Sequence, residues 1–118
     1  MDIGIVGCGS ISSQYMIGLK KNKKEINVVA CADKDIDKSK SFAKKHSIDS
    51  LSVEELLINK DVDIVINLTP PSSHFDISLK SLENGKHVFS EKPLCLTIEE
   101  GKKLYSTMKR NSVYLFSA

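Results

Sequence analysis

A glycine-rich turn close to the N-terminus is the first part of this sequence that could do chemistry. An apolar run leads into the pattern Gly7-x-Gly9-x-x-Ser12, and a helical pattern begins directly behind it. In such a turn the first glycine permits a tight bend, the second lets the backbone approach a pyrophosphate, and the third position must be small so that helix packs on strand. Ser12 replaces the usual glycine or alanine, which is a modest departure. The pattern predicts a phosphate-binding turn, with an ordinary strand-to-helix turn as the alternative.

An acidic residue, Asp33, follows the next apolar run and stands 21 residues after Ser12. In dinucleotide-binding folds, a carboxylate about 20 residues beyond the glycine turn accepts hydrogen bonds from the ribose hydroxyls of adenosine. The same charge repels a 2′-phosphate, so Asp33 favours NAD over NADP, and the neighbouring Lys34 softens that preference. A solvated turn aspartate is the alternative, because Asp33-Lys34-Asp35 is itself turn-like.

Two later segments also place polar side chains directly after apolar runs. The segment from Thr69 to His74 contains two prolines, which favour a stiff extended turn before the next helix. The spacing predicts that His74 is a structural residue of the first helical turn, and the alternative is a catalytic base. Glu91-Lys92 places an acid and an amine at another strand end. A partly desolvated lysine there could move a proton to or from a carbinol oxygen, and a solvated ion pair is the alternative.

The elements that must position these turns alternate along the chain. Short apolar runs rich in β-branched residues predict strands, and helical periodicity separates them, with helices over Ile11–Lys21 and from about His74. Ser52 and Thr97 open S/T-x-x-E patterns that mark helix starts, and Gly85 suits the position past a helix end. Repeated β-α units predict an α/β fold, a doubly wound, mostly parallel Rossmann sheet of about six strands with helices on both faces. The apolar runs are Ile3–Val6, Ile26–Ala32, Val62–Leu68, His87–Phe89 and Val113–Phe116.

Length and composition restrict the class of protein. A chain of 118 residues with 41% hydrophobic residues fits one globular domain. Its net charge of +2 is too small to indicate nucleic-acid binding. No apolar segment approaches the length of a membrane-spanning helix. The three cysteines form no C-x-x-C pair, which argues against a disulfide framework and a zinc site. These features predict a cytoplasmic protein with reduced thiols, no metal, and no nucleic-acid or membrane partner.

Cys8 stands inside the glycine turn, at the start of the predicted helix. A helix N-terminus lowers the pKa of a thiol, so a redox-sensing cysteine is one interpretation. A small side chain that fills space beside the phosphate-binding turn is the other, and we favour it.

These stretches, taken in order, resemble the N-terminal NAD(P)-binding domain of the Gfo/Idh/MocA family, named for glucose-fructose oxidoreductase, inositol dehydrogenase and MocA. The resemblance covers nearly the whole chain, and its last two stretches are far more selective than a glycine turn alone. It implies an oxidoreductase that transfers hydride between nicotinamide and a carbinol carbon of a sugar, an inositol or a related polyol. The matching stretches are Gly4–Ser12, Cys31–Asp33, Val62–His74 and Gly85–Leu94.

The resemblance also implies a role for each matched residue. Lys92 would be the catalytic residue, lying near the nicotinamide and the substrate hydroxyl and assisting proton transfer. The cofactor would be NAD, with NADP as the alternative. The cofactor-binding residues would be Gly7, Gly9, Ser10, Ile11, Asp33, Lys34, Thr69, Pro70, His74, Glu91 and Lys92.

Members of this family continue into an α+β domain that supplies most substrate contacts. We therefore expect residues 1–118 to be the dinucleotide-binding domain without that C-terminal domain, and to show little or no turnover alone. We expect the parent protein to form homo-oligomers. One alternative is a stand-alone dinucleotide-sensing module without catalysis. Another is a methyltransferase that binds adenosylmethionine, in which the turn at Glu91-Lys92-Pro93 has no obvious purpose.

Overall fold

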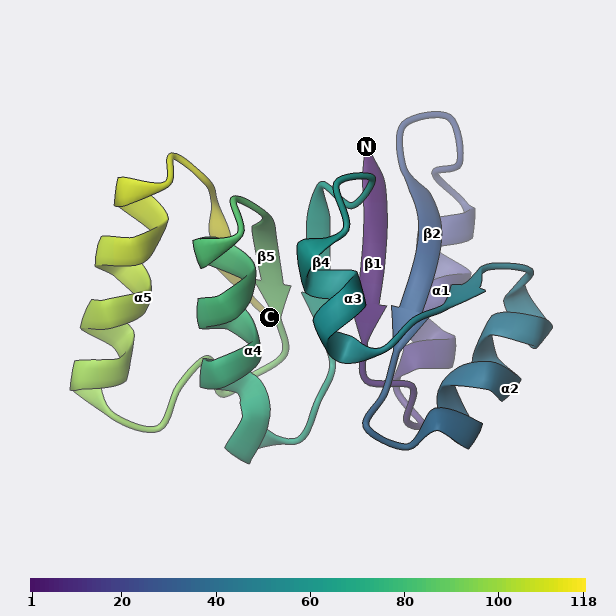
Figure 1. Cartoon of the computed structure of the whole chain (residues 1–118), viewed down its shortest axis with the longest axis horizontal. Coiled ribbons are helices and arrows are strands. Elements are labelled where there is room, and N and C mark those ends of the chain that lie inside the picture. The colour runs from purple at the N-terminus through teal and green to yellow at the C-terminus, as the bar shows by residue number, and fades with distance from the viewer.

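Six parallel strands form one open sheet in the order β3-β2-β1-β4-β5-β6, in a computed structural model that describes all of residues 1–118. The chain starts in the middle of the sheet, builds outward to β3, and then crosses back to build the other half (Figure 1). The predicted doubly wound α/β sheet is confirmed. The strands are β1 (Asp2–Val6), β2 (Asn27–Ala32), β3 (Asp49–Ser50), β4 (Ile64–Asn67), β5 (His87–Ser90) and β6 (Leu115–Ser117).

Helices cover both faces of this sheet. Figure 1 shows α3 and α4 in front of the strands, α5 beside α4 at the left, and α1 behind the strands. Side chains of α1 and α2 share one apolar cluster with the sheet, built around Ile5, Met16 and Phe42, while α3 packs through Leu56 on the opposite face. The helices are α1 (Ser12–Lys20), α2 (Ile36–His46), α3 (Val53–Ile58), α4 (Pro71–Glu83) and α5 (Ile98–Arg110).

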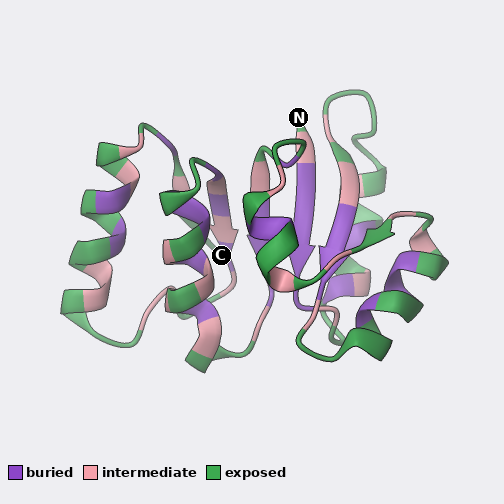
Figure 2. Ribbon diagram, viewed as in Figure 1, coloured by how far each residue is buried: buried purple, intermediate pink, exposed green.

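The core lies in the central strands. Figure 2 shows burial concentrated along β1, β2 and β4 and on the sides of the helices that face them. Ile5 and Val65 are fully buried, as expected for central parallel strands covered on both faces. The structure has no helix with enough length and apolar character to cross a membrane. Nor does any group of three or more His, Cys, Asp or Glu side chains come together where a metal ion could bind.

Local sequence signals set the helix ends. Ser52 Oγ accepts a hydrogen bond from Glu55 N at 3.1 Å, and Thr97 Oγ1 accepts one from Glu100 N at the same distance, so both predicted caps are confirmed. Gly85 has a φ of +73° beyond α4, as predicted.

Two details of the predicted elements differ from the structure. Helix α4 begins at Pro71, before the expected start near His74, because proline fits the first helical position, where its missing N–H costs nothing. Strand β3 was not among the predicted strands because its two residues, Asp49 and Ser50, are exposed and carry no apolar pattern.

Candidate functional site

A cleft of about 330 Å³ lies beyond the carboxyl ends of the central strands, where the strand order reverses between β1 and β4. It brings together eight of the predicted site residues, drawn from the turns after β1, β2 and β4. These eight are Gly7, Gly9, Ser10, Ile11, Asp33, Lys34, Thr69 and Pro70. The other lining residues are Val6, Lys38, Val53, Leu68, Ser73 and Ile77.

The surroundings of Gly7 and Gly9 show why glycine stands at each of these two positions in the turn. Gly7 has a φ of +103°, and a Cβ there would lie 2.6 Å from the carbonyl carbon and oxygen of Leu68, so no other residue fits. A Cβ on Gly9 would meet no atom of the chain within 4 Å. The protein's own packing therefore requires glycine at position 7, whereas the space beside Gly9 is left open to a ligand.

Ser12 occupies the third position of the pattern without disturbing it. Its side chain is fully buried, and Ser12 Oγ donates a hydrogen bond to the carbonyl oxygen of Gly9 at 2.5 Å. The hydroxyl is therefore satisfied inside the turn, and serine serves as the small residue that this position needs.

Three consecutive backbone N–H groups in this turn have no acceptor within the chain: those of Gly9, Ser10 and Ile11. They precede α1, and its N-cap residue Ile11 makes no side-chain capping bond. Unpaired N–H groups at a helix N-terminus, together with the positive end of the helix dipole, bind phosphate groups. The turn therefore fits a pyrophosphate.

Asp33 links the turn after β2 to the glycine turn. Its Oδ2 accepts a hydrogen bond from Cys8 N and its Oδ1 accepts one from Asp35 N, each at 2.8 Å. Each carboxylate oxygen retains a further lone pair, so the side chain can still accept hydrogen bonds from ribose hydroxyls.

Lys38 is a cleft residue that the sequence analysis missed. It lies in the first turn of α2, lines the cleft together with Asp33 and Lys34, and is exposed. Asp35 caps α2, accepting hydrogen bonds from Asp37 N and Lys38 N. The sequence signal that could have identified Lys38 is the helix cap at Asp35. A helix that starts there places Lys38 about one turn after Lys34, on the same side of the turn after β2.

Asn67, also missed, organises the turn after β4. It is fully buried, and its Nδ2 donates to the carbonyl oxygen of His74 and to Ser78 Oγ, each at 3.0 Å. Its Oδ1 accepts from Thr69 Oγ1 at 2.6 Å. A polar residue that closes an otherwise apolar strand was the signal in the sequence.

His74 is buried behind the cleft and does not line it. Its side chain is 1% exposed, with Nδ1 lying 2.6 Å from the carbonyl oxygen of Pro93 and Nε2 lying 2.5 Å from that of Thr69. The ring thus connects the turn after β4 to the turn after β5. Its contact with a cofactor stays a prediction.

Glu91 and Lys92 lie in the turn after β5, at the same edge of the sheet but outside the lining of the cleft. The carboxylate of Glu91 accepts hydrogen bonds from Tyr15 Oη at 2.5 Å and from Lys92 N at 3.2 Å. Lys92 is exposed, its ammonium group has no hydrogen-bond partner in the chain, and its peptide bond to Pro93 is cis. The Lys92 side chain is therefore not paired with any other group of the chain.

The surroundings of Cys8 oppose the redox interpretation. Its interaction with the neighbouring Cys31 thiol, its burial and the negative charge of Asp33 all raise the pKa of the Cys8 thiol. A raised pKa disfavours the thiolate, which is the reactive form. Cys8 packs against the apolar cluster of α1 and α2, which is the arrangement expected of a side chain that fills space.

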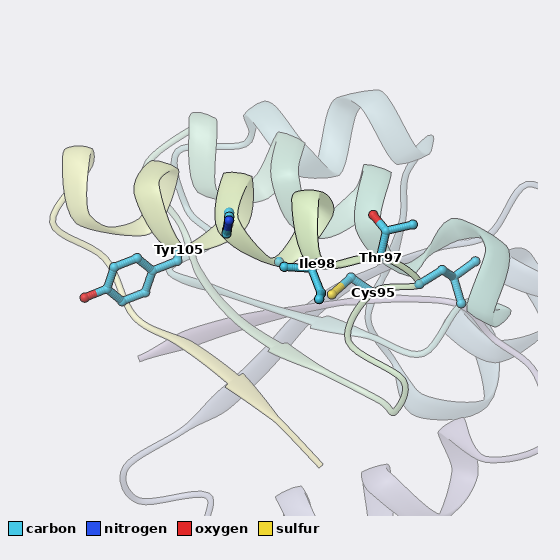
Figure 3. A pocket seen from close by; sticks show the side chains of 7 residues that line it. Cys95, Thr97, Ile98 and Tyr105 are labelled. Atoms are coloured by element: carbon cyan, nitrogen blue, oxygen red, sulfur yellow. The ribbon is translucent and has the colours of Figure 1, made fainter.

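A second hollow of about 550 Å³ lies along the start of α5 (Figure 3). Figure 3 shows Cys95, Ile98 and Tyr105 along one side of that helix. Its walls are mostly apolar, and Leu96, Ile98 and Tyr105 are each more than half exposed. It shares no residue with the cleft, so it forms a separate apolar surface.

The strand order and a glycine turn with unpaired N–H groups beside an acidic residue define a Rossmann-type dinucleotide-binding domain. Comparison with protein families agrees: the model of the Gfo/Idh/MocA oxidoreductase family, described as an NAD-binding Rossmann fold, matches residues 1–118. The chain belongs to this family, as the resemblance predicted.

Individual relatives extend this comparison. The chain is 33% identical over 118 residues to trans-1,2-dihydrobenzene-1,2-diol dehydrogenase of Xenopus tropicalis, covering 98% of the chain and 36% of that protein. It is 31% identical over 111 residues to scyllo-inositol 2-dehydrogenase (NAD(+)) of Bacillus subtilis, covering 92% of the chain and 32% of that protein. The chain thus spans about a third of the length of these curated relatives.

Solved structures show the same fold. The WlbA dehydrogenase of Chromobacterium violaceum, crystallised with NADH and UDP-GlcNAcA, superposes with a TM-score of 0.94 at 27% identity. The match covers 100% of this chain and 34% of that one.

Proposed function

We propose that residues 1–118 form the dinucleotide-binding domain of an oxidoreductase that transfers hydride between NAD and a carbinol carbon of a sugar, an inositol or a related polyol. The observation that carries this proposal is the row of unpaired N–H groups at Gly9, Ser10 and Ile11, in the same cleft as Asp33. Groups suited to a phosphate and to a ribose thus lie in one cleft, as a dinucleotide requires, which supports the proposal.

Each part of the cofactor has residues that fit it. The N–H groups of the glycine turn would bind the pyrophosphate, and Asp33 would accept hydrogen bonds from the adenosine ribose. Thr69 and Pro70, in the turn after β4, would border the nicotinamide half. The negative charge of Asp33 favours NAD, while Lys34 and Lys38 give the cleft two positive charges that a 2′-phosphate could meet.

Lys92 would carry the proton transfer. Bound nicotinamide supplies the hydride donor or acceptor. The exposed ammonium of Lys92 can hold a proton at a substrate hydroxyl oxygen or release one to it, and no group of the chain competes for it. Two of these relatives, a dihydrobenzene-diol dehydrogenase and an inositol dehydrogenase, are named for hydroxylated rings, which supports a ring carbinol as the substrate class.

The apolar surface at the start of α5 supports a second domain in the parent protein. Leu96, Ile98 and Tyr105 line one hollow and are more than half exposed. Since the relatives are about three times longer, we propose that their additional domain packs near these side chains and supplies substrate contacts. Residues 1–118 alone should then show little or no turnover on any polyol.

Calorimetric titration with NADH and with NADPH tests the proposal directly. Saturable binding of NADH, tighter than that of NADPH, is the expected result because Asp33 opposes a 2′-phosphate. Tighter binding of NADPH would assign the dominant role at this end of the cleft to Lys34 and Lys38. If the folded chain bound neither nucleotide, the proposed cofactor site would be wrong.

A further inference from the structure

Tyr15 and Glu91 are 76 positions apart in the sequence, yet Tyr15 Oη donates a hydrogen bond to Glu91 Oε1 at 2.5 Å. Tyr15 lies in the first turn of α1, directly behind the glycine turn, and its ring packs edge-on against Phe89 of β5 at 6.1 Å between centroids. The aromatic contact and the hydrogen bond together place the hydroxyl on the turn that contains Lys92.

Both oxygens of the Glu91 carboxylate are occupied. Oε1 accepts from Tyr15, and Oε2 accepts from the backbone N–H of Lys92 at 3.2 Å. The backbone of Glu91 is also fixed, because its N–H donates to the carbonyl oxygen of Asn67 at 3.0 Å. A carboxylate held at both oxygens has a single orientation, and it passes that restraint to the backbone of Lys92.

We propose that Tyr15 is a positioning residue for Lys92, acting through Glu91. The inference rests on the proposed role of Lys92 in proton transfer. It also connects the two halves of the site, because the helix that holds Tyr15 begins at the N–H groups assigned to the pyrophosphate. Without the hydroxyl, the carboxylate of Glu91 could turn toward water, and Lys92 would lose a backbone restraint.

The state of the hydroxyl suits this role. Burial, followed by the hydrogen bond and negative charge of Glu91, raises the pKa of Tyr15 to about 12. The phenol therefore keeps its proton, and can donate it to Glu91 in a hydrogen bond, throughout the neutral range.

The test compares Tyr15→Phe with Tyr105→Phe in the 118-residue chain. Tyr15→Phe keeps the ring against Phe89 and removes the hydroxyl alone, whereas Tyr105 is an exposed tyrosine whose hydroxyl makes no hydrogen bond in the chain. Hydrogen exchange at the Lys92 amide, followed by NMR, should accelerate roughly fivefold in Tyr15→Phe and be unchanged in Tyr105→Phe. Glu91→Gln, a second variant at the other end of the contact, should accelerate the same amide.

The fluorescence of bound NADH provides a second measurement, which should not change if Tyr15 only stabilises the fold. Tyr15→Phe should keep the Kd for NADH within about threefold, because the pyrophosphate and ribose contacts are untouched, but should change the emission of the bound nicotinamide. A Tyr15→Phe protein that melts earlier while Lys92 exchange and nicotinamide emission equal those of the wild type would overturn the proposal. If the wild type bound no NADH, the proposed cofactor site would fail, and exchange at Lys92 would still decide the role of Tyr15.

Discussion

The backbone N–H of Cys8 donates a hydrogen bond to Asp33 Oδ2 at 2.8 Å, which joins the glycine turn after β1 to the turn after β2. One carboxylate thus has two functions. It holds the shape of the glycine turn, and it lines the cleft, where its remaining lone pairs can accept hydrogen bonds from the proposed ribose. A change at Asp33 should therefore affect both the turn and the choice of nucleotide.

Asp33→Ser should shift the preference of the cleft from NADH toward NADPH. Loss of a charged acceptor for ribose hydroxyls costs about 1.5 to 3 kcal/mol, so the Kd for NADH should rise roughly 10- to 100-fold. NADPH should lose less, because a charge that repels its 2′-phosphate is also removed. Calorimetry with both nucleotides measures the change.

Asp37→Ser changes a nearby exposed acid outside the cleft. It is the matched control for Asp33→Ser and should change the affinity for neither nucleotide. Unchanged affinities in Asp33→Ser would contradict its assignment.

The two glycines of the turn should fail in different ways when replaced by alanine. Gly7→Ala places a methyl group 2.6 Å from the backbone of Leu68 at a φ of +103°, so the fold should lose roughly 2 kcal/mol or more. Gly9→Ala meets no atom of the chain, so its melting temperature should match the wild type within about 2 °C. NADH binding should nevertheless be lost in Gly9→Ala, because the methyl group takes the space proposed for the pyrophosphate. Normal NADH affinity in Gly9→Ala would show that no ligand approaches that carbon.

Features encoded by neighbouring residues could be predicted from the sequence. The strand-turn-helix pattern at Gly7 and Gly9, and the caps at Ser52 and Thr97, each depend on a few consecutive residues, and the structure contains all of them. The fold followed from the alternation of such segments. Asp33 could be assigned to the cleft because the spacing from the glycine turn is set by one β-α-β unit.

Features that depend on contacts between distant residues could not be predicted. Tyr15 lies in a helix that reads as amphipathic, and nothing local connects it to Glu91. The strand at Asp49–Ser50 exists through its pairing with Ala30 and Cys31, a contact that leaves no apolar pattern in two exposed residues. The tertiary fold, and not the strand propensity of the residues involved, determines such pairings.

Lys38→Ala should weaken binding of NADPH and leave that of NADH nearly unchanged. Lys38 lines the cleft next to Asp33 and Lys34, so its ammonium is available to a 2′-phosphate. An exposed ion pair of this kind contributes about 1 kcal/mol, and the Kd for NADPH should rise roughly fivefold in low salt. Lys40→Ala is the control, because Lys40 is an exposed lysine of the same helix outside the cleft. Equal losses for both nucleotides would indicate a general effect of charge instead of a 2′-phosphate contact.

Lys86→Met should destabilise the fold without touching the cleft. Lys86 is 5% exposed, and its Nζ donates to the carbonyl oxygens of Asn59 and Val62 at 2.6 and 2.9 Å. Methionine preserves the length of the side chain but leaves both oxygens without a donor, which should cost about 2 kcal/mol or more. Lys80→Met, an exposed lysine on α4, should cost less than about 0.5 kcal/mol. Urea unfolding at pH 7 distinguishes the two variants, and equal stabilities would contradict a structural role for Lys86.

The pH dependence of stability in the wild type and in Lys86→Met provides a second test of the role of Lys86. Burial lowers the pKa of Lys86 below its ordinary value of 10.5, against a smaller opposing effect of Asp63. Between the lowered pKa of the folded protein and 10.5, the unfolded chain holds the proton and the folded chain has lost it. The free energy of unfolding should therefore rise with pH through this window as far as Lys86 contributes. Lys86→Met lacks that contribution, so the stability difference between wild type and variant should widen as the pH rises through this window toward 10.5. A difference that stays constant over this interval would show that the Lys86 ammonium is not destabilised by burial.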